Sequence, residues 1–231
     1  MNGRPLNLTW ADENIPAILE TWHLGTQSGN AIAEVLYGNY NPSGKLTMSF
    51  PRNVGQVPLY YNYKKTGRPG ASSAEVTKST YADVENSPLY PFGYGLSYTN
   101  FTYSELSLSS KEITRDDTIV VSVKITNTGK VKGKEVAQMY IRDHYGSLAR
   151  PIKELKGFEL LELNPGETKE VSFEIDNSKL VYYTANDRWE SETGKFSVFI
   201  GGDSDVKDLS LIHISEPTRP RLISYAVFCL K

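Results

Sequence analysis

The stretch Ile119-Val-Val-Ser-Val-Lys-Ile-Thr-Asn127 decides the fold, because its side chains alternate in character from one residue to the next. Positions 119, 121, 123 and 125 carry only Ile and Val, whereas the positions between them include Ser, Lys and Thr. Successive side chains of a β-strand point to opposite faces of the sheet, so the pattern predicts a strand with one buried face. Asn127-Thr-Gly129 is typical of a turn and is predicted to end this strand.

Further short strands are predicted downstream, at Val136–Ile141, Val171–Ile175, Leu180–Tyr183 and Phe196–Ile200. Asn164-Pro-Gly166 supplies a strong turn signal between two of them. Short strands separated by turn residues indicate a β-sandwich of immunoglobulin or fibronectin type over residues 101–208. Cys229 is the only cysteine and lies outside this range, which excludes the disulfide-bearing immunoglobulin variant.

Upstream, residues 13–37 carry the strongest helical pattern. Asn14 is an acceptable N-cap, and apolar residues follow it at helical spacing, at Ile15, Ile18, Leu19 and Trp22. Gly25 and Gly29 interrupt the pattern, so we predict two helices joined by a glycine-bearing turn. A strand over Leu46–Phe50 is predicted to follow them.

Residues 51–100 are rich in Pro, Gly, Asn, Ser and Tyr and show little periodicity, which predicts a linker. We expect it to pack through its aromatic side chains, because a free coil rarely carries so many. These are Tyr60, Tyr61, Tyr63, Tyr81, Tyr90, Phe92, Tyr94 and Tyr98.

Composition narrows the class of protein. The 231 residues suggest one large domain or two smaller ones. The net charge of −2 gives no basic field for nucleic acid. No run approaches the ~18 consecutive apolar residues of a membrane span. The 15 Tyr are explained more simply by antiparallel sheet than by carbohydrate binding.

The chain offers no clear metal or nucleotide site. His23 and His144 lie far apart without partner spacing, so each is predicted to be a surface or packed histidine. Asp203-Ser-Asp205 only weakly resembles a calcium loop, because the loop's glycine and terminal Glu are missing. Gly93-Tyr-Gly95 begins like a dinucleotide fingerprint but has no third glycine, and it predicts a turn.

Glycosidases need two carboxylates that flank the scissile bond. The chain has many acids, but nothing in the sequence singles out a pair among residues such as Asp12, Glu13, Glu20, Asp83 and Glu85. Two glycosylation sequons, which arise easily by chance, begin at Asn7 and Asn100. Residue chemistry alone therefore predicts only a helical segment followed by a β-sandwich.

Residues 209–231 differ from the rest of the chain. Leu209–Arg219 and Ile223–Lys231 each resemble a translated DNA-sequencing adapter, with a short variable index between them. The sheet is expected to be complete at Ile200, before the polar stretch 203–208. We therefore predict a non-native tail over 209–231 and read no function from His213 or Cys229. A genuine terminal strand over Ile223–Leu230 is the alternative.

Several motifs resemble family 3 of the glycoside hydrolases. Asn2-Gly-Arg-Pro-Leu6 and the segment Glu13–Trp22 are similar to the end of that family's second domain. The likeness continues without a gap through Gly29–Leu36, Asn41–Leu46 and Phe50–Gln56. Pro88-Leu-Tyr-Pro-Phe-Gly-Tyr-Gly-Leu-Ser-Tyr98 is similar to the family's linker into its third domain.

Other motifs bring the chain closest to the bacterial periplasmic β-glucosidases, namely Tyr60-Tyr-Asn62, Thr66–Pro69 and Arg150–Phe158. The resemblance covers residues 1 to about 208. It implies that the fold is mainly β, with a fibronectin type III-like sandwich over 101–208 and a linker over 51–100. Residues 1–50 would be the C-terminal helices and strand of a truncated α/β sandwich domain.

The resemblance also implies how the parent enzyme works. Family members retain anomeric configuration, using an Asp nucleophile on an (α/β)₈ barrel and a Glu acid/base on the second domain. Both residues normally precede the Asn2–Pro5 match, so no catalytic residue is assigned in this chain. No metal or cofactor is implied, and the substrate-binding residues are unassigned. His23 stands where relatives usually place another aromatic residue.

We therefore expect a C-terminal fragment of a periplasmic or secreted β-glucosidase, inactive alone, which braces the active-site domain. Its partners would be the missing barrel and sandwich domains in cis, and a β-glucoside or oligosaccharide would be the parent's substrate. A stand-alone carbohydrate-binding or adhesion module is the alternative. Residues 101–208 are expected to fold alone and 1–50 are not, which would leave an apolar stripe exposed, made of Ile18, Leu19, Trp22, Ile32 and Leu36.

Overall fold

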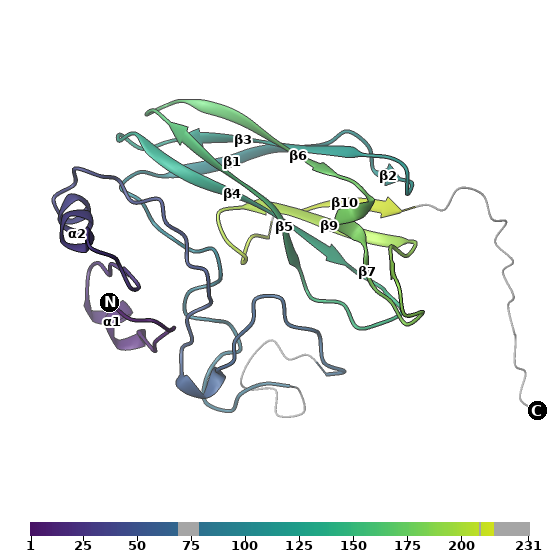
Figure 1. Ribbon diagram of the computed structural model, residues 1–231, viewed down its shortest axis with the longest axis horizontal. Coiled ribbons are helices and arrows are strands. Elements are labelled where there is room, and N and C mark those ends of the chain that lie inside the picture. The colour runs from purple at the N-terminus through teal and green to yellow at the C-terminus, as the bar shows by residue number, and fades with distance from the viewer. Residues whose placement is uncertain (69–78, 208, 215–231) are drawn as a thin grey trace, which may run out of the picture.

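The computed structural model describes residues 1–68 and 79–207 and the backbone of 209–214, and its largest part is a two-layered β-sandwich (Figure 1). One sheet has the order β1-β3-β6 and the other β2-β10-β9-β4-β5, with a β7-β8 ribbon beside them. The strands are β1 (Phe101–Leu108), β2 (Glu112–Ile113), β3 (Ile119–Asn127), β4 (Gly133–Asp143), β5 (Glu154–Leu163), β6 (Thr168–Ile175), β7 (Tyr182–Tyr183), β8 (Trp189–Glu190), β9 (Gly194–Gly201) and β10 (Leu209–Ile214).

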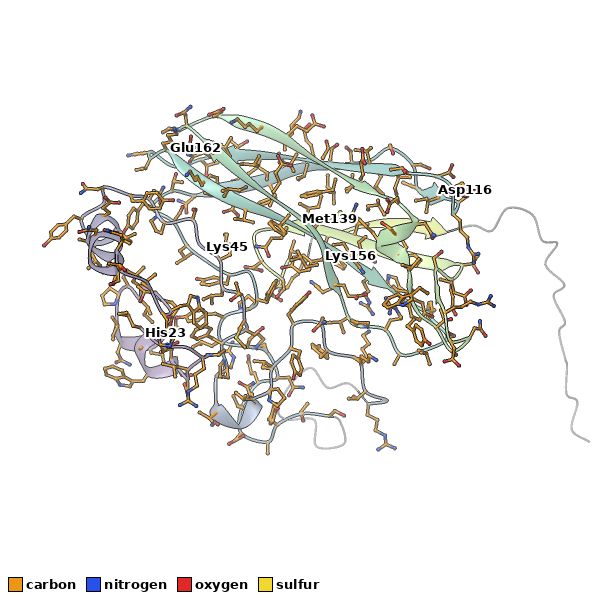
Figure 2. All side chains as sticks on the ribbon, in the orientation of Figure 1. His23, Lys45, Asp116, Met139, Lys156 and Glu162 are labelled. Atoms are coloured by element: carbon orange, nitrogen blue, oxygen red, sulfur yellow. The ribbon has the colours of Figure 1, made fainter. Side chains whose placement is uncertain are left out.

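The core lies between the two sheets and is built from the alternation seen in the sequence. β3 is buried at every second position, and it pairs antiparallel with β1 on one side and with β6 on the other. Figure 2 shows Met139 of β4 between the sheets, where it is fully buried. The apolar residues predicted for β3, β4, β6 and β9 are confirmed as one cluster, which contains Ile119, Val121, Val123, Ile125, Ala137, Met139, Ile141, Val171, Phe173, Ile175, Phe196, Val198 and Ile200.

Two details of the predicted sheet are wrong. Leu180 ends a short helix, α3 (Asn177–Leu180), which the side chain of Asp176 caps, so the strand begins only at Tyr182. The sheet also continues past Ile200, because the backbone of β10 pairs with β9 along its whole length and with β2 at its end. Main-chain pairing at the free edge of β9 needs no particular side chains. The adapter-like origin of 209–231 stays a prediction, and the alternative strand 223–230 lies outside the described residues.

The helical prediction for residues 13–37 is half right. Helix α2 (Ser28–Leu36) occupies the second half, but the first helix, α1 (Thr9–Asn14), ends where a helix was predicted to begin. Ile15 is extended, with φ −117° and ψ 125°, and the backbone stays non-helical through Leu24. Pro16 explains the start of this segment, because a proline disfavours the helical conformation of the residue before it.

The strand predicted over Leu46–Phe50 is only partly formed. Backbone hydrogen bonds join Leu46 to Gly93 and Tyr94 and join Phe50 to Leu89 and Tyr90, and a single β-bridge forms, between Phe50 and Tyr90. A short 3₁₀ helix, η1 (Val54–Gln56), follows. The 46–50 segment therefore runs beside the end of the linker.

The linker crosses the five-stranded sheet on the face opposite the core (Figure 1). Its early part meets the loop before β5, where Lys64 bridges Pro151 and the amide of Ile152 donates to the carbonyl of Tyr63 at 3.0 Å. In its later part, the carbonyl of Phe92 accepts a hydrogen bond from the amide of Ser204 at 2.8 Å. The linker is thereby fixed to the sandwich at both ends of its crossing.

Candidate functional site

The most elaborate polar site of the described chain is the face where the linker covers the sandwich, and Gln138 is at its centre. Its neighbours on β4, Ala137 and Met139, belong to the core, so Gln138 points away from the core, yet it is only 3% exposed. Its Nε2 donates to the carbonyls of Gly93, at 3.2 Å, and Gly202. Its Oε1 accepts from the Tyr140 hydroxyl at 2.6 Å. One side chain thus joins the linker, β4 and the turn after β9. We call Tyr61, Phe92, Gly93, Gln138 and Tyr140 the docking face.

Gly93 occupies a position of this face that strongly favours glycine. Its φ is +83°, a conformation that favours glycine. A Cβ placed on Gly93 would lie 2.1 Å from Oε1 of Gln138. The turn predicted at Gly93-Tyr-Gly95 lies slightly earlier, over residues 91–94, where the Tyr94 amide donates to the Pro91 carbonyl at 3.2 Å. The glycine permits the linker backbone to approach β4 closely.

Aromatic rings close the docking face. Tyr61 stacks on Phe92 with ring centroids 4.3 Å apart, and its ring meets Tyr140 nearly edge-on at 6.0 Å. The hydroxyl of Tyr61 also accepts from the amide of Leu155 on β5, at 3.2 Å. Burial raises the pKa of Tyr140 well above its ordinary value, so its hydroxyl stays a donor at every physiological pH. The prediction that the linker packs through its aromatic side chains is half right, because four of the eight are exposed, namely Tyr60, Tyr63, Tyr81 and Tyr98.

A second polar cluster, formed by Lys45, Glu135 and Tyr103, ties the N-terminal segment to the sandwich. Nζ of Lys45 lies 3.1 Å from Oε2 of Glu135 and donates to the carbonyl of Gly95 at 3.0 Å. The Tyr103 hydroxyl donates to Oε1 of Glu135 at 2.8 Å. Burial and the neighbouring Glu135 carboxylate raise the pKa of Tyr103. Figure 2 shows Lys45 on the segment between the helices and the sandwich. The cluster therefore joins three separate parts of the chain.

The acids considered for catalysis do not form a pair. Asp12 accepts from the Tyr90 hydroxyl at 2.6 Å, Glu20 accepts from Asn2 and the Trp22 amide, and Glu85 lies 3.7 Å from Arg52. Glu13 and Asp83 are exposed. Among the described residues, no hydrogen bond or ion pair brings two of these five acids to a common group. Local partners account for Asp12, Glu20 and Glu85, and the absence of a catalytic residue from this chain stays a prediction.

The two histidines are also separated. His23 is exposed, and its ring covers Gly3, where an added Cβ would lie 2.6 Å from Nε2. His144 follows β4, and its Nε2 lies 2.7 Å from Oγ of Ser197 on β9. Burial first, and then the positive charges of Arg142, Lys65 and Lys195, lower the pKa of His144. Within ranges 1–68 and 79–207 no three His, Cys, Asp or Glu residues gather in a metal-binding group.

The acidic turn Asp203–Asp205 is occupied by a protein cation. Nζ of Lys153 donates to the carbonyls of Ser204, at 2.8 Å, and Val206, at 3.0 Å. It also lies 4.5 Å from the centroid of the Phe199 ring. The backbone carbonyls of this turn are therefore already paired with an ammonium group.

A buried ion pair holds the loop between β4 and β5. Nε of Arg150 lies 3.2 Å from Oδ2 of Asp143, and the two side chains are 13% and 3% exposed. Arg150 also pairs with Glu154 at 2.8 Å and covers the Tyr182 ring at 3.9 Å from its centroid. Burial raises the pKa of Asp143, although the Arg150 charge acts in the opposite direction. The loop borders a pocket of about 310 Å³.

A larger pocket, of about 500 Å³, opens between the N-terminal residues and the linker. Its lining is mainly apolar and includes Leu6, Met48, Val57, Pro58 and Tyr60. Met48, Val57 and Tyr60 are each more than half exposed. The N-terminal segment and the start of the linker thus present apolar surface to solvent here.

Sequence reasoning missed Gln138, Glu135 and Lys45, which organise both polar clusters. A polar residue on a strand reads as solvent-facing unless the covering segment is known. The only available signal was Gly93-Tyr-Gly95, whose two glycines allow the close backbone approach. An added Cβ on Gly95 would lie 2.4 Å from the carbonyl oxygen of Gly44.

Known proteins share both parts of the chain. Residues 1–98 match the glycosyl hydrolase family 3 C-terminal domain, and residues 135–204 match a fibronectin type III-like domain. The periplasmic beta-glucosidase of Salmonella typhimurium is 55% identical over 205 residues, which are 88% of this chain and 27% of the relative. A beta-xylosidase of Formosa agariphila is 46% identical over 215 residues, which are 93% of this chain and 29% of that protein.

Solved structures show the same likeness. The beta-glucosidase of Listeria innocua in complex with isofagomine superposes with a TM-score of 0.88 at 41% identity, over 94% of this chain and 30% of that one. The chain thus spans a little under a third of the relatives that it matches. In the part of the chain that the structure describes, no helix is long and apolar enough to cross a membrane. Residues 1–98 are therefore a glycosyl hydrolase family 3 C-terminal domain, and a fibronectin type III-like domain follows them in the chain.

Proposed function

We propose that this chain is the C-terminal part of a retaining β-glucosidase that releases terminal β-D-glucosyl residues from glucosides or oligosaccharides. The nucleophile and the acid/base lie on domains upstream, and the residues present here serve to brace the active-site domain. The Salmonella relative is named as periplasmic, which supports a periplasmic or secreted parent enzyme.

The docking face carries the bracing proposal. A free linker would leave Gln138 and Tyr140 in water, but both side chains are buried beneath it, at 3% and 0% exposure. The buried amide is hydrogen-bonded on both sides, to the linker carbonyl of Gly93 and to the Tyr140 hydroxyl. Satisfied buried polar groups fix one geometry, because any shift leaves donors and acceptors unpaired. The sandwich can therefore hold the end of the family 3 domain in a single position.

The exposed apolar surface of the N-terminal segment supports the proposal that further domains precede this part of the parent enzyme. Ile18, Leu19 and Leu36 of the predicted apolar stripe are exposed, whereas Trp22 and Ile32 are half-buried. The non-helical residues 15–24 form no strand with any described part of the chain. A preceding portion of the α/β domain would cover this apolar surface and supply strand partners.

A stand-alone carbohydrate-binding module is the less supported function. Such a module would show exposed aromatic rings in a row on one sheet. The exposed pair Tyr183 and Trp189 instead lies on the β7-β8 ribbon, with the two rings 5.9 Å apart and tilted by 68°. Cross-strand packing explains this pair without a ligand.

A chimera tests the proposal. Residues 1–207 would replace the matching segment of the Salmonella enzyme, and hydrolysis of p-nitrophenyl β-D-glucoside would be measured for the chimera and for the isolated chain. The proposal predicts an active chimera and an inactive isolated chain. Gly93→Ala in the chimera is expected to lower thermal stability and activity together. Gly166→Ala is the control, because Gly166 also has a positive φ but has open space around it, so the change would strain only its own turn. Hydrolysis by the isolated chain would contradict the proposal.

A further inference from the structure

The 310 Å³ pocket beside the β4–β5 loop lies just beyond the docking face, where the linker leaves the sheet. Arg142 follows Tyr140 on the outer face of β4, and Lys65 follows the Lys64–Pro151 bridge on the linker. His144, Tyr145 and the loop through Ile152 complete the wall. The volume falls at the small end of ligand sites, which suits one sugar unit.

The pocket carries an excess of positive charge. Asp143 is the one carboxylate in its lining, and it is paired with Arg150. Arg142 and Lys65 make no ion pair with a carboxylate in the described ranges of the chain. His144 is held toward its neutral form by burial and by these neighbouring cations. A chain whose net charge is −2 thus places in one small concavity two cations that have no ion-pair partner among residues 1–68 and 79–207.

The wall is held in shape by contacts that do not use these two cations. Asp143 accepts from the Tyr145 amide at 3.2 Å. The Ser147 amide donates to the Tyr182 hydroxyl at 2.9 Å and to the Glu192 carboxylate at 2.7 Å. A wall that is fixed before a ligand arrives loses little entropy when it binds.

We propose that this pocket binds the carboxylate of an acidic sugar, such as a uronic acid unit. The guanidinium of Arg142 supplies two parallel N–H donors that match a carboxylate, and Lys65 adds a second charge. Tyr145, which is 78% exposed at the rim, offers its ring face to the sugar. The site is separate from the proposed brace, and either proposal can fail alone.

The test compares methyl β-D-glucuronide with methyl β-D-glucoside. The two differ only at C6, which is a carboxylate in the first and a hydroxymethyl group in the second. Isothermal titration calorimetry of the full 231-residue chain at low salt is expected to show binding of the glucuronide at least tenfold tighter than that of the glucoside. Arg142→Gln is expected to weaken glucuronide binding about tenfold and Lys65→Gln about threefold. Lys130→Gln removes an exposed lysine on a distant turn and is expected to leave the affinity unchanged.

Equal affinity for the two glycosides would overturn the proposal, as would glucuronide affinity that Arg142→Gln leaves intact. Inorganic phosphate is the third probe, and phosphate binding at the pocket without glucuronide binding would also overturn it, because the site would then recognise a bare anion. Circular dichroism melting of each variant checks that the loop and sheet remain folded, and unchanged melting with lost glucuronide binding supports the proposal.

Discussion

Replacement of Gln138 by leucine tests whether the docking face holds the linker to the sandwich. Leucine is close to glutamine in size, so the change removes hydrogen bonds without opening a large cavity. The carbonyl of Gly93 loses its partner beneath the linker, and the Tyr140 hydroxyl loses its acceptor. The carbonyl of Gly202 is less buried and can bind water.

The magnitude follows from the two buried groups. Leaving a buried polar group unpaired costs about 1–3 kcal/mol, and two such groups give about 2–6 kcal/mol. The added apolar burial of leucine offsets about 1 kcal/mol of this. We therefore expect Gln138→Leu to lower the free energy of unfolding by about 3 kcal/mol.

Urea unfolding followed by circular dichroism measures this change. Gln27→Leu serves as the control, because Gln27 is exposed, its side chain does not cap α2, and its one side-chain hydrogen bond, from Asn30, is open to water; the change is expected to matter by less than about 0.5 kcal/mol. The double variant with Tyr140→Phe is expected to lose about 1 kcal/mol less than the sum of the single variants, since both remove the same hydrogen bond. A Gln138→Leu protein as stable as the Gln27→Leu control, or strict additivity in the cycle, would refute the reasoning.

Three further predictions concern the sandwich itself. Arg150→Met is expected to lower the free energy of unfolding by about 3 kcal/mol in urea, because Asp143 is left buried and unpaired, and adding Asp143→Asn should recover part of the loss. Asp176→Ala should cost about 1 kcal/mol at pH 7 by removing the α3 cap. The hydrogen bond from Ser178 lowers the pKa of Asp176, so the cap's contribution is present above about pH 4 and is lost as the pH falls through the lowered pKa. The free energies of unfolding of the parent protein and of Asp176→Ala should therefore converge near pH 2, and a difference that persists there would contradict the assignment. Limited proteolysis is expected to degrade the N-terminal segment first and leave a resistant core that begins near residue 101, whereas a protected N-terminal fragment would contradict independent folding of the sandwich.

β3, β4, β6 and β9 could be predicted because each carries its own apolar pattern, whereas β1, β2, β5 and β8 were not predicted. In β3 the burial alternates at every position, so the two-residue period of the sequence reports directly on the core. β10 could not be expected on the same grounds, because its place rests on backbone pairing with β9 at an open sheet edge.

The error at residues 15–24 has a different cause. Apolar residues at positions 15, 18, 19 and 22 satisfy a helical spacing, but tertiary context can override such a local preference. Pro16 was the contrary signal, and it favours the extended conformation that the structure shows at Ile15. The second half of the helical region had no such conflict, and α2 formed there.

The docking face was not predictable from β4 alone. Gln138 occupies a position whose direction is outward, and outward polar residues usually meet water. Only the linker, about 45 residues earlier in the chain, turns this position into a buried one. Contacts between segments so distant in sequence leave no periodic pattern. The sequence feature that indicates these contacts is the pair of glycines at 93 and 95.

The central claim is that this chain is the C-terminal part of a β-glucosidase whose chemistry lies upstream. Resequencing the source DNA across both ends of the reading frame tests it most directly. The account predicts that the frame continues upstream of Met1 into a barrel that carries an aspartate nucleophile and a second domain that carries the glutamate acid/base. A stop codon directly before Met1, together with genomic DNA that encodes residues 209–231, would contradict it.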